Sequence, residues 1–409
     1  MRCGLLGRKL GHSYSPQIHS FLGNYSYQLY EKEPEEIGDF LKNGDFSAIN
    51  VTIPYKKDVL QHCTRLTECA KRMGAVNTIV RQPDGSLLGH NTDYFGFRFM
   101  VERSGLNPTG KKVVVIGSGG ASNTAIIALK DLGAEVIVLS HRENTPQTQA
   151  LHSDAKIIVN ATPVGMYPNN GVSPVDLDNF PSLEGVLDMI YNPARTKLLM
   201  DAEKRSLITE NGLSMLVAQA KEAAEWFTGC SIDDSIIDVI HKSLRHQMEN
   251  ISIIGMPGSG KSHIGKLLAE VLNKKFIDTD EEIEKLAGKP IPQIFSDSGE
   301  EVFRNYETEV LEQLGKRSGL VIATGGGCVT RAANYLLLHQ NSTVIWLCRD
   351  LNLLPTNGRP LSQAGRLEDM YKVRKPLYEA FSDFSVNNDS EPKEVVKQIS
   401  TFLSMENTI

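Results

Sequence analysis

The sequence has 409 residues, which at roughly 150 residues per domain corresponds to about three compact domains and excludes a single small binding module. Apolar residues make up 41% and charged residues 22%, a composition typical of globular proteins, so a largely disordered or fibrous chain is excluded. With 43 Lys and Arg against 49 Asp and Glu, the formal net charge is -6, which argues against nucleic acid or anionic lipid as a partner.

Neither the start of the sequence nor any later stretch carries the apolar run of a secretory signal or a membrane span. The six cysteines are scattered, without the spacing of a disulfide scaffold or a CxxC metal pair. We therefore expect a soluble cytoplasmic protein with reduced thiols that binds neither nucleic acid nor membrane.

Polar clusters interrupt the first hundred residues where a core would otherwise be expected. They are Ser13-Tyr14-Ser15-Pro16, Asn50-Val51-Thr52-Ile53-Pro54-Tyr55-Lys56, Gly74-Ala75-Val76-Asn77-Thr78 and Asn91-Thr92-Asp93. Each cluster alone is typical of a turn or a helix cap. Their number weakens that interpretation and favours a polar binding site.

A βαβ unit is predicted between Lys111 and Ser140, with strands at Val113–Ile116 and Glu135–Leu139. The intervening turn, GSGGAS at residues 117–122, has the context of a dinucleotide-binding turn, although Ser122 replaces the third glycine of GxGxxG. A tight strand–helix turn without a ligand is the alternative. After the second strand the chain reads Ser140-His141-Arg142, and an arginine without a preceding acid favours NADP over NAD. A solvated loop arginine remains the alternative there.

A helical pattern that begins near Ile232 ends at the expected domain boundary, Met248 to Asn250. A second βαβ unit follows from Ile251, and its turn, GMPGSGKS at residues 255–262, is a complete GxxxxGKS motif. In that motif backbone N–H groups cradle phosphates, Lys261 reaches the β and γ oxygens, and Ser262 binds Mg²⁺. The motif predicts a nucleoside triphosphate site but does not name the acceptor.

Five features downstream bear on the acceptor. They are Asp278-Thr279-Asp280, the pair Arg304 and Glu307, Thr324-Gly325-Gly326-Gly327, Arg359-Pro360-Leu361, and Arg374-Lys375-Pro376-Leu377-Tyr378. Taken singly, Arg304 with Glu307 is typical of a solvated helix-surface pair and Arg359 of a loop charge. Together, the five features are not explained by solvated surface charges alone.

Along residues 1 to about 248, the motifs HSxSP, NVTxPxK, GAVNT, NTDxxG, GxGGA, NxTPxGM, DxxYxP and GLxMLxxQ resemble those of shikimate dehydrogenase, in order. The resemblance implies a substrate domain (1–103 and 213–248) and an NADP-binding Rossmann domain (104–212). It implies a catalytic pair, Lys56 and Asp93, in which the ammonium stabilises the developing oxyanion and donates a proton. It further implies substrate contacts from Ser13, Ser15, Thr52, Asn77, Asp93, Tyr191 and Gln219, and cofactor contacts from Gly117, Gly119, Gly120, Ala121, His141, Arg142, Thr162 and Gly212.

Residues 251 to about 400 resemble shikimate kinase, which implies a P-loop domain with a parallel sheet over 251–409. The resemblance implies ATP contacts from Gly258, Ser259, Gly260, Lys261, Ser262, His263 and Arg359, with Lys261 and the lid residue Arg359 also catalytic. Ser262 and Asp278 would hold Mg²⁺, and Asp280 would act as the base. The acceptor would be bound by Asp280, Arg304, Gly325, Gly326, Gly327 and Arg374, with Glu307 orienting Arg304.

The two resemblances name consecutive reactions, so we interpret the chain as an α/β bifunctional enzyme that reduces 3-dehydroshikimate and phosphorylates shikimate, using NADP(H), ATP and Mg²⁺. One alternative is an NAD-dependent quinate/shikimate dehydrogenase fused to a kinase of broader acceptor choice. Another keeps one half as an inactive binding module. Departures from the family patterns are Lys9 for Pro, Asn123 for a cofactor-turn Arg, His263 for a hydroxyl residue and Asn352 for an adenine-stacking Arg.

Overall fold

The computed structural model describes residues 1–11, 13–354 and 364–406. The chain folds into two compact units, Met1–His241 and Lys242–Ile409. The division falls inside helix α9 (Ser235–Met248), which corresponds to the helix predicted from near Ile232. Within the described residues, none of the helices has the length and apolar character needed to span a membrane. All six cysteines are free thiols.

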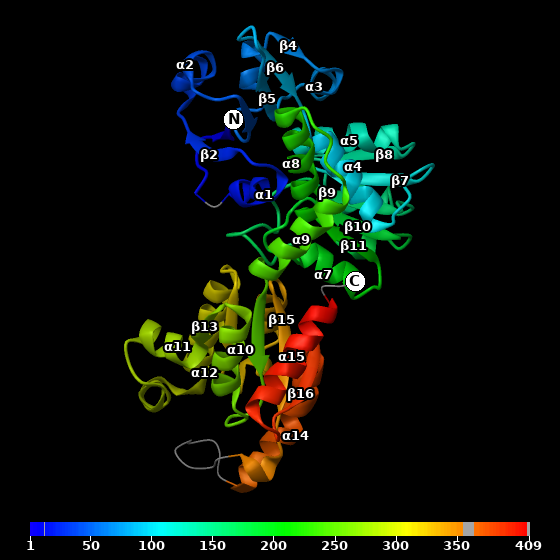
Figure 1. Ribbon diagram of the computed structural model, residues 1–409. Helices are drawn as coiled ribbons and strands as arrows, with labels where there is room; N and C mark the ends of the chain where they lie inside the picture. The colour runs from blue at the N-terminus through cyan, green and yellow to red at the C-terminus, as the bar shows by residue number, and fades with distance from the viewer. Residues whose placement is uncertain (12, 355–363, 407–409) are drawn as a thin grey trace. The chain divides into compact units, whose positions relative to one another are not determined.

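The first sheet of the first unit has the strand order β2-β1-β3-β5-β6-β4. Its strands β2, β4, β5 and β6 are labelled in Figure 1. β1 runs parallel to β2 and β3, whereas β5 runs antiparallel to β3 and β6. The strands are β1 (Arg2–Gly7), β2 (Ser26–Glu31), β3 (Ala48–Val51), β4 (Arg65–Leu66), β5 (Thr78–Arg81) and β6 (Leu87–His90). The helical segments of this region are α1 (Ser15–Leu22), η1 (Pro34–Glu36), α2 (Ile37–Asn43), η2 (Asp58–His62), α3 (Glu68–Met73) and α4 (Asp93–Ser104).

The second sheet of this unit is parallel, with the order β11-β10-β9-β7-β8. Its strands are β7 (Lys112–Ile116), β8 (Glu135–Leu139), β9 (Ile157–Asn160), β10 (Gly185–Asp188) and β11 (Ile208–Asn211). The helical segments are α5 (Gly120–Asp131), α6 (Pro146–Ala150), η3 (Leu177–Asn179), α7 (Lys197–Glu203) and α8 (Leu213–Thr228). The predicted strand–turn–helix–strand order between residues 111 and 140 is therefore confirmed.

Helix α8 connects the two parts of the first unit. It follows the second sheet in sequence, yet it packs on β3 and β5 of the first sheet and against α1 and α4. Its buried face is rich in alanine, including Ala220, Ala223 and Ala224, which lets neighbouring elements approach closely. This return brings Gln219 next to the segment that opens α4.

The second unit is built on a parallel sheet with the order β13-β14-β12-β15-β16. Its strands are β12 (Asn250–Ile254), β13 (Lys275–Asp278), β14 (Leu320–Ala323), β15 (Ser342–Cys348) and β16 (Phe384–Asn387). The helical segments are α10 (Lys261–Leu272), α11 (Thr279–Ala287), α12 (Ile291–Gly315), η4 (Cys328–Thr330), α13 (Ala333–His339), η5 (Leu351–Leu353), α14 (Ala364–Phe381) and α15 (Pro392–Glu406). The central strands β12, β14 and β15 are almost entirely buried, as expected for a parallel sheet with helices on both faces. Ligands of such sheets bind at the carboxyl ends of the strands.

Candidate active sites

The first unit contains an ion pair between two elements of its first sheet region. Lys56 lies in the turn after β3, and Asp93 is the first residue of α4. Lys56 Nζ donates to Asp93 Oδ2 at 2.7 Å, and the side chains are 30% and 16% exposed. The pair is therefore screened from bulk water but open on one side, which suits a group that exchanges a proton with a ligand.

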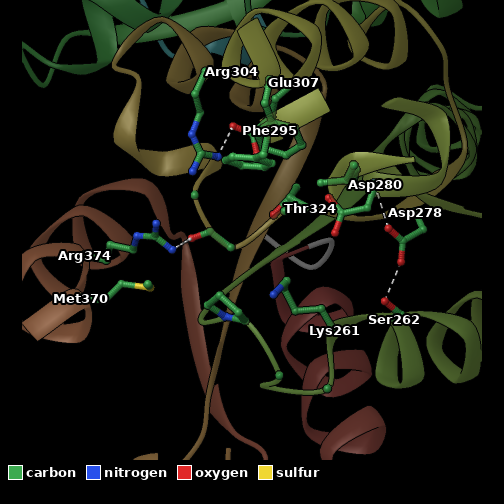
Figure 2. A pocket seen from close by; sticks show the side chains of 18 of the residues that line it. Lys261, Ser262, Asp278, Asp280, Phe295, Arg304, Glu307, Thr324, Met370 and Arg374 are labelled. Atoms are coloured by element: carbon green, nitrogen blue, oxygen red, sulfur yellow. Dashed lines mark hydrogen bonds and ion pairs between the residues drawn. The ribbon is translucent and has the colours of Figure 1, made fainter. Parts of the chain in front are cut away.

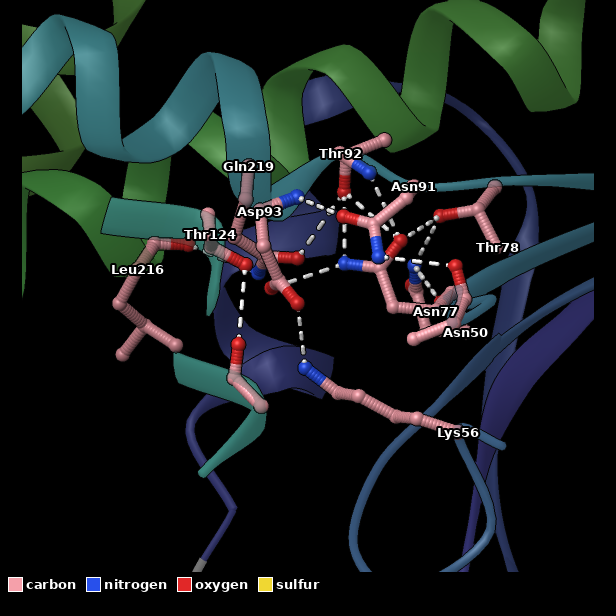
Figure 3. A network of polar contacts seen from close by, with 12 residues as sticks. Asn50, Lys56, Asn77, Thr78, Asn91, Thr92, Asp93, Thr124, Leu216 and Gln219 are labelled. Atoms are coloured by element: carbon pink, nitrogen blue, oxygen red, sulfur yellow. Dashed lines mark hydrogen bonds and ion pairs between the residues drawn. The ribbon is translucent and has the colours of Figure 1, made fainter. Parts of the chain in front are cut away.

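A buried amide, that of Asn77, holds the other oxygen of Asp93 (Figure 3). Asn77 Nδ2 donates to Asp93 Oδ1 at 2.9 Å, and Asn77 Oδ1 accepts the Thr92 backbone N–H at 2.8 Å. The Thr92 hydroxyl donates to Gln219 Oε1 at 3.3 Å, so α8 joins the same network. Asn77 is 2% exposed and Thr92 is fully buried. Both carboxylate oxygens of Asp93 are thus fixed by groups of the protein itself.

A second line of polar groups runs from this network toward the start of α1. Asn50 Nδ2 donates to Thr78 Oγ1 at 3.2 Å, and Thr78 Oγ1 donates to Asn77 Oδ1 at 3.1 Å. The hydroxyl of Tyr27 donates to Asn50 Oδ1 at 2.8 Å and also hydrogen-bonds Ser15. Burial of the phenol keeps the pKa of Tyr27 well above its ordinary value. The line therefore consists of neutral groups that connect Ser15 to the Lys56–Asp93 pair.

Ser13 and Ser15 flank the N-terminus of α1. Ser13 Oγ accepts the Ser15 backbone N–H at 3.2 Å, and both residues are partly exposed. Tyr14, between them, meets Tyr191 edge-to-face with ring centroids 6.4 Å apart. Tyr191 follows β10 of the second sheet, and burial raises the pKa of its hydroxyl. The two serines and Tyr191 are thus brought to one region from the two parts of the unit.

The glycine turn after β7 has room for a pyrophosphate. Gly117 has a φ of 115°, and the hydroxyl of buried Ser122 donates to the Gly117 carbonyl at 2.7 Å. Serine at the position of the third glycine therefore closes the turn. At Gly119 and Gly120 a Cβ would meet no heavy atom within 4 Å. The open space lies at the N-terminus of α5, where unpaired N–H groups favour an anion, so these residues fit a dinucleotide.

The other predicted cofactor residues lie on loops after the neighbouring strands. Thr162 follows β9 and donates its hydroxyl to Asn160 Oδ1 at 2.7 Å. Gly212 caps α8, and a Cβ there would lie only 2.1 Å from the Met189 carbonyl, so its position requires glycine. His141 and Arg142 are exposed at the end of β8. Both side chains can therefore reach a ligand bound over that edge.

Glu143 lies beside this exposed arginine. It accepts from the Ser140 hydroxyl at 2.5 Å and from the Ser140 N–H at 3.3 Å. These hydrogen bonds hold the pKa of the Glu143 carboxyl below its ordinary value, so the group is charged at neutral pH. A negative charge therefore lies shortly after the end of β8, at the edge where a cofactor ribose is expected.

The loop after β12 has the backbone of a phosphate-binding loop. Gly255, Gly258 and Gly260 have φ values of 146°, 85° and 96°, which favour glycine. Lys261 opens α10 and donates to the Gly255 and Met256 carbonyls at 2.9 and 3.0 Å. The ammonium is therefore held inside the loop, and the adjacent N-terminus of α10 favours a phosphate. These residues fit a nucleoside triphosphate.

Two oxygen ligands suited to Mg²⁺ lie beside Lys261. Ser262 Oγ donates to Asp278 Oδ2 at 2.6 Å, and Asp278 Oδ1 accepts the Asp280 N–H at 3.0 Å. Mg²⁺ is usually held by one or two protein oxygens together with waters and phosphates, and the pair fits that pattern. Among the described residues no cluster of three or more His, Cys, Asp or Glu forms a fuller metal site.

A cavity of about 460 Å³ extends from this loop to α12 and α14 (Figure 2). Arg304 Nη1 donates to Glu307 Oε2 at 2.9 Å, and both residues are buried. Arg374 Nη1 donates to the Gly326 carbonyl at 3.1 Å. Two guanidinium groups therefore border one end of the cavity, while Lys261, Ser262 and Asp278 border the other.

At each of the three glycines after β14, a different neighbouring residue occupies the space that a side chain would need. A Cβ at Gly325, Gly326 or Gly327 would lie 2.7 Å from Glu307 Oε1, 2.6 Å from Pro257 Cδ or 2.1 Å from Arg304 Nη2, respectively. The glycines therefore let this backbone pass between the phosphate loop and the arginine. Asp280, in the first turn of α11, lies on the same side, because a Cβ at Gly325 would be 3.1 Å from Asp280 Oδ1.

Comparison with known proteins identifies the families of both units. The family model described as "Shikimate dehydrogenase substrate binding domain" matches residues 5–79, and the model described as "Shikimate kinase" matches residues 257–404. A shikimate dehydrogenase (NADP(+)) of Clostridium perfringens is 36% identical over 266 residues, 59% of this chain and 97% of that protein. The chain belongs to the shikimate dehydrogenase family. Its second unit is a shikimate kinase domain.

Solved structures support the fold of the dehydrogenase unit. Shikimate dehydrogenase 1 of Peptoclostridium difficile is 37% identical, with a TM-score of 0.53 over 60% of this chain and 97% of that one. A Thermus thermophilus shikimate 5-dehydrogenase in complex with NADP(H) and shikimate is 31% identical, with a TM-score of 0.54 over 59% and 99%. The predicted α/β fold, with a dehydrogenase region followed by a P-loop kinase domain, is confirmed.

The predicted residues are not all joined by direct contacts. In the dehydrogenase unit Lys56, Asp93, Asn77 and Gln219 share one network, whereas Thr52, after β3, contributes a backbone N–H to the Leu6 carbonyl. In the kinase unit Gly258, Gly260, Lys261, Ser262, His263, Asp278, Asp280, Arg304, Gly325, Gly326, Gly327 and Arg374 all line the cavity. Ser259 is buried in the loop beneath it, and Arg359 lies outside the described residues.

Sequence reasoning missed Tyr27 and Arg349, and it named Asn50 only as a member of a polar cluster. Tyr27 and Asn50 link Ser15 to the catalytic pair, a role that only the pairing of β1, β2 and β3 reveals. Arg349 follows β15, and its Nη1 lies 3.8 Å from where a Cβ on Gly260 would stand. Its Nε is buried and no described residue bonds to it. The sequence did offer a signal for Arg349, because it directly follows an apolar run typical of a buried strand. That strand, β15, pairs with β12, so both strands end at the phosphate loop.

Asn123, which replaces the arginine common in the cofactor turn of the family, makes a contact that joins two helices. Asn123, in the first turn of α5, donates its amide to the Met73 carbonyl at the end of α3, at 2.9 Å. Nearby, Arg72 forms two bonds to Asp131 at 2.8 and 2.9 Å. The cofactor helix is therefore tied to a helix of the first sheet region at both of its ends.

Proposed function

We propose that the chain catalyses two successive steps: reduction of 3-dehydroshikimate to shikimate with NADPH, and phosphorylation of the shikimate 3-hydroxyl with ATP and Mg²⁺. The observation that carries the proposal is that each unit sets a nucleotide-binding turn beside side chains suited to one hydroxylated ring acid. Shikimate dehydrogenase and shikimate kinase families also match the two units in that order.

In the dehydrogenase unit, the residues 1–103 and 213–248 would bind the ring acid and residues 104–212 the cofactor. The packing of α8 on β3 and β5 supports this division. Ser13 and Ser15 would bind the carboxylate, and Thr52, Asn77, Tyr191 and Gln219 would contact the ring substituents. Bound NADPH would supply the hydride, and bound ATP with Mg²⁺ the phosphoryl group, in the two reactions.

Lys56 would stabilise the developing oxyanion and then give it a proton. Asp93 would hold the ammonium through Oδ2, the oxygen that already accepts from Nζ. Because Asn77 already fixes Oδ1, the carboxylate would need little reorganisation when the ring binds. The line of neutral hydrogen bonds from Ser15 to Asn77 would fix the position of the carboxylate-binding serines relative to the Lys56–Asp93 pair.

In the kinase unit, Asp280 would accept the proton of the attacking hydroxyl, while Arg304 and Arg374 would clamp the carboxylate of the acid. Lys261 would leave the Gly255 and Met256 carbonyls for phosphate oxygens, and Ser262 with Asp278 would hold Mg²⁺. Glu307 would keep the guanidinium of Arg304 in place, because it already binds Nη1. Closure by Arg359 over the phosphates is part of the same proposal.

NADP is favoured over NAD because Arg142 is exposed at the end of β8 and can meet a 2′-phosphate. Glu143 opposes that preference, since its charge lies at the same edge. Free thiols agree with action in the reducing cytoplasm.

Steady-state rates test this proposal against its rival. Reduction should require 3-dehydroshikimate and proceed with higher kcat/KM for NADPH than for NADH, and phosphorylation should proceed with shikimate as acceptor. Equal or better rates with quinate and NAD in the reverse direction, or equal phosphorylation of quinate, would favour the quinate/shikimate alternative. Absence of one activity would favour an inactive module in that half.

A further inference from the structure

The guanidinium of Arg304 is bracketed by two carboxylates of its own helix. Glu300 lies four residues before it and Glu307 three residues after it, and residues at these spacings are neighbours on one helix face. Gly299, with φ 79° and ψ 177°, interrupts α12 immediately before Glu300. Glu300 is therefore the first residue of the helical segment that carries Arg304.

Each terminal nitrogen of Arg304 already bonds a carboxylate oxygen. Nη1 donates to Glu307 Oε2 at 2.9 Å, and Nη2 donates to Glu300 Oε1 at 3.0 Å. The remaining surroundings are close: the Phe303 ring centroid lies 5.2 Å from Arg304 Cζ, and the backbone of Gly327 passes against the guanidinium. A carboxylate on a ligand can reach Nη2 when Glu300 leaves it.

The two carboxylates differ in how readily they can leave. The side chain of Glu307 is 1% exposed, so without Arg304 its charge would be buried and unpaired, at a large cost in free energy. The side chain of Glu300 is 55% exposed, so its charge can turn into water at little cost. Its place at the start of a helical segment also suits a negative charge without a side-chain partner.

We propose that Glu300 stands in for the carboxylate of the acceptor: it holds Nη2 of Arg304 until the acceptor binds, and the carboxylate of the incoming acid displaces it. This inference rests on the proposed function, in which Arg304 clamps that carboxylate. Glu300 then sets the affinity for the acceptor and makes a negative charge on the acceptor necessary for full engagement of Arg304, because a neutral ligand does not compete for Nη2.

Replacement of the charge alone tests the proposal. Glu300→Gln keeps the length of the side chain and an oxygen that can accept from Nη2, but it removes the competing charge. We expect kcat/KM for ATP-dependent phosphorylation of shikimate to rise about fivefold. The rise should come from a lower KM, with kcat unchanged. A change of about fivefold in affinity corresponds to the loss of one partly exposed ion pair. Rates are measured without NADP(H), so that the dehydrogenase does not turn over.

The methyl ester of shikimate separates charge competition from a structural effect. The ester lacks the anionic group, so its kcat/KM should be the same in Glu300→Gln as in the unchanged chain. Glu301→Gln is the matched control, because Glu301 is the adjacent residue, is 83% exposed and pairs with Arg331 outside the cavity. We expect it to leave both acceptors unaffected.

Three results would overturn the inference: an unchanged KM for shikimate in Glu300→Gln, an equal change for the acid and its ester, or an equal effect of Glu301→Gln. A failure of the proposed function looks different, since the unchanged chain would then not phosphorylate shikimate at all. The dehydrogenase rate of each variant reports whether the chain has folded.

Discussion

Lys56 and Asp93 are 37 positions apart in the sequence, yet the ammonium of one lies 2.7 Å from a carboxylate oxygen of the other. The pair forms because two adjacent residues hold its members. The Val76 backbone N–H donates to the Lys56 carbonyl, and the Asn77 side-chain amide donates to the Asp93 carboxylate. One short segment before β5 therefore positions both members of the proposed catalytic pair.

Loss of the Lys56 ammonium should stop reduction selectively. We expect Lys56→Ala to lower kcat for 3-dehydroshikimate reduction by roughly 10²–10⁴-fold, the usual worth of a positioned general acid, and to leave kinase rates unchanged. Lys57→Ala is the matched control, since Lys57 is the adjacent exposed lysine, and should retain full activity. Comparable losses in the two variants would remove Lys56 from its proposed role.

Cofactor choice should depend on opposing charges at the end of β8. Arg142→Ala should raise KM for NADPH by roughly 10- to 160-fold without changing KM for NADH, because a charged hydrogen bond is worth about 1.5–3 kcal/mol. Glu143→Gln should move the preference the other way, by lowering KM for NADPH, because its charge would repel a 2′-phosphate. Initial rates with both cofactors measure the preference, and equal shifts for NADPH and NADH would contradict the assignment.

The glycine at position 327 should be irreplaceable in the kinase. A Cβ there would stand 2.1 Å from Arg304 Nη2, so Gly327→Ala must push the guanidinium from its place. We expect kcat/KM for shikimate phosphorylation to fall by roughly 5- to 160-fold, which corresponds to the roughly 1–3 kcal/mol cost of overpacking. Dehydrogenase activity of the same sample is the internal control. A kinase of normal efficiency would show that the arginine is not held against this backbone.

The buried carboxyl of Asp188 should make the stability of the first unit depend on pH. Burial raises its pKa from the ordinary 3.8 to about 7, against hydrogen bonds from Thr196, Ile190 and Asn160. Because the folded pKa is the higher one, the folded state keeps a proton that the unfolded state releases. Its contribution to stability is complete below about pH 4 and is lost as the pH rises through 7.

Asp188→Asn removes that titration, so between pH 6 and pH 8 the Tm of the variant should fall less than that of the parent, by several degrees. Trp226 lies in the first unit and Trp346 in the second, and the chain has two tryptophans. In a Trp346→Phe background, fluorescence therefore reports the first unit. Parallel curves of Tm against pH for the parent and the Asp188→Asn variant would show that this carboxyl does not titrate in that range.

The sequence was most informative where function depends on a local backbone pattern. The turns at 117–122 and 255–262 could be predicted because glycine, an adjoining strand and a following helix are all encoded within a few residues. The contact between Arg304 and Glu307 could also be predicted from their spacing, but that spacing alone favoured a solvated surface pair, whereas the pair is buried.

The remaining contacts depend on how distant segments pack, and no local pattern encodes them. Asn123 could be identified only as a departure from the family, because its contact with Met73 requires α3 and α5 to meet. Tyr27 and Asn50 come together through strand pairing. Glu300 lies in the same helix as Arg304. The helix is interrupted at Gly299, and the sequence alone does not predict that the segment with Arg304 begins at Glu300.

The proposed pair of activities is tested most directly by one reaction that contains the chain, 3-dehydroshikimate, NADPH, ATP and Mg²⁺, with the products identified by mass. We predict shikimate 3-phosphate, formed with equal consumption of NADPH and ATP, and none of it when either nucleotide is omitted. Accumulation of shikimate without a phosphorylated product, or no oxidation of NADPH, would contradict the proposal.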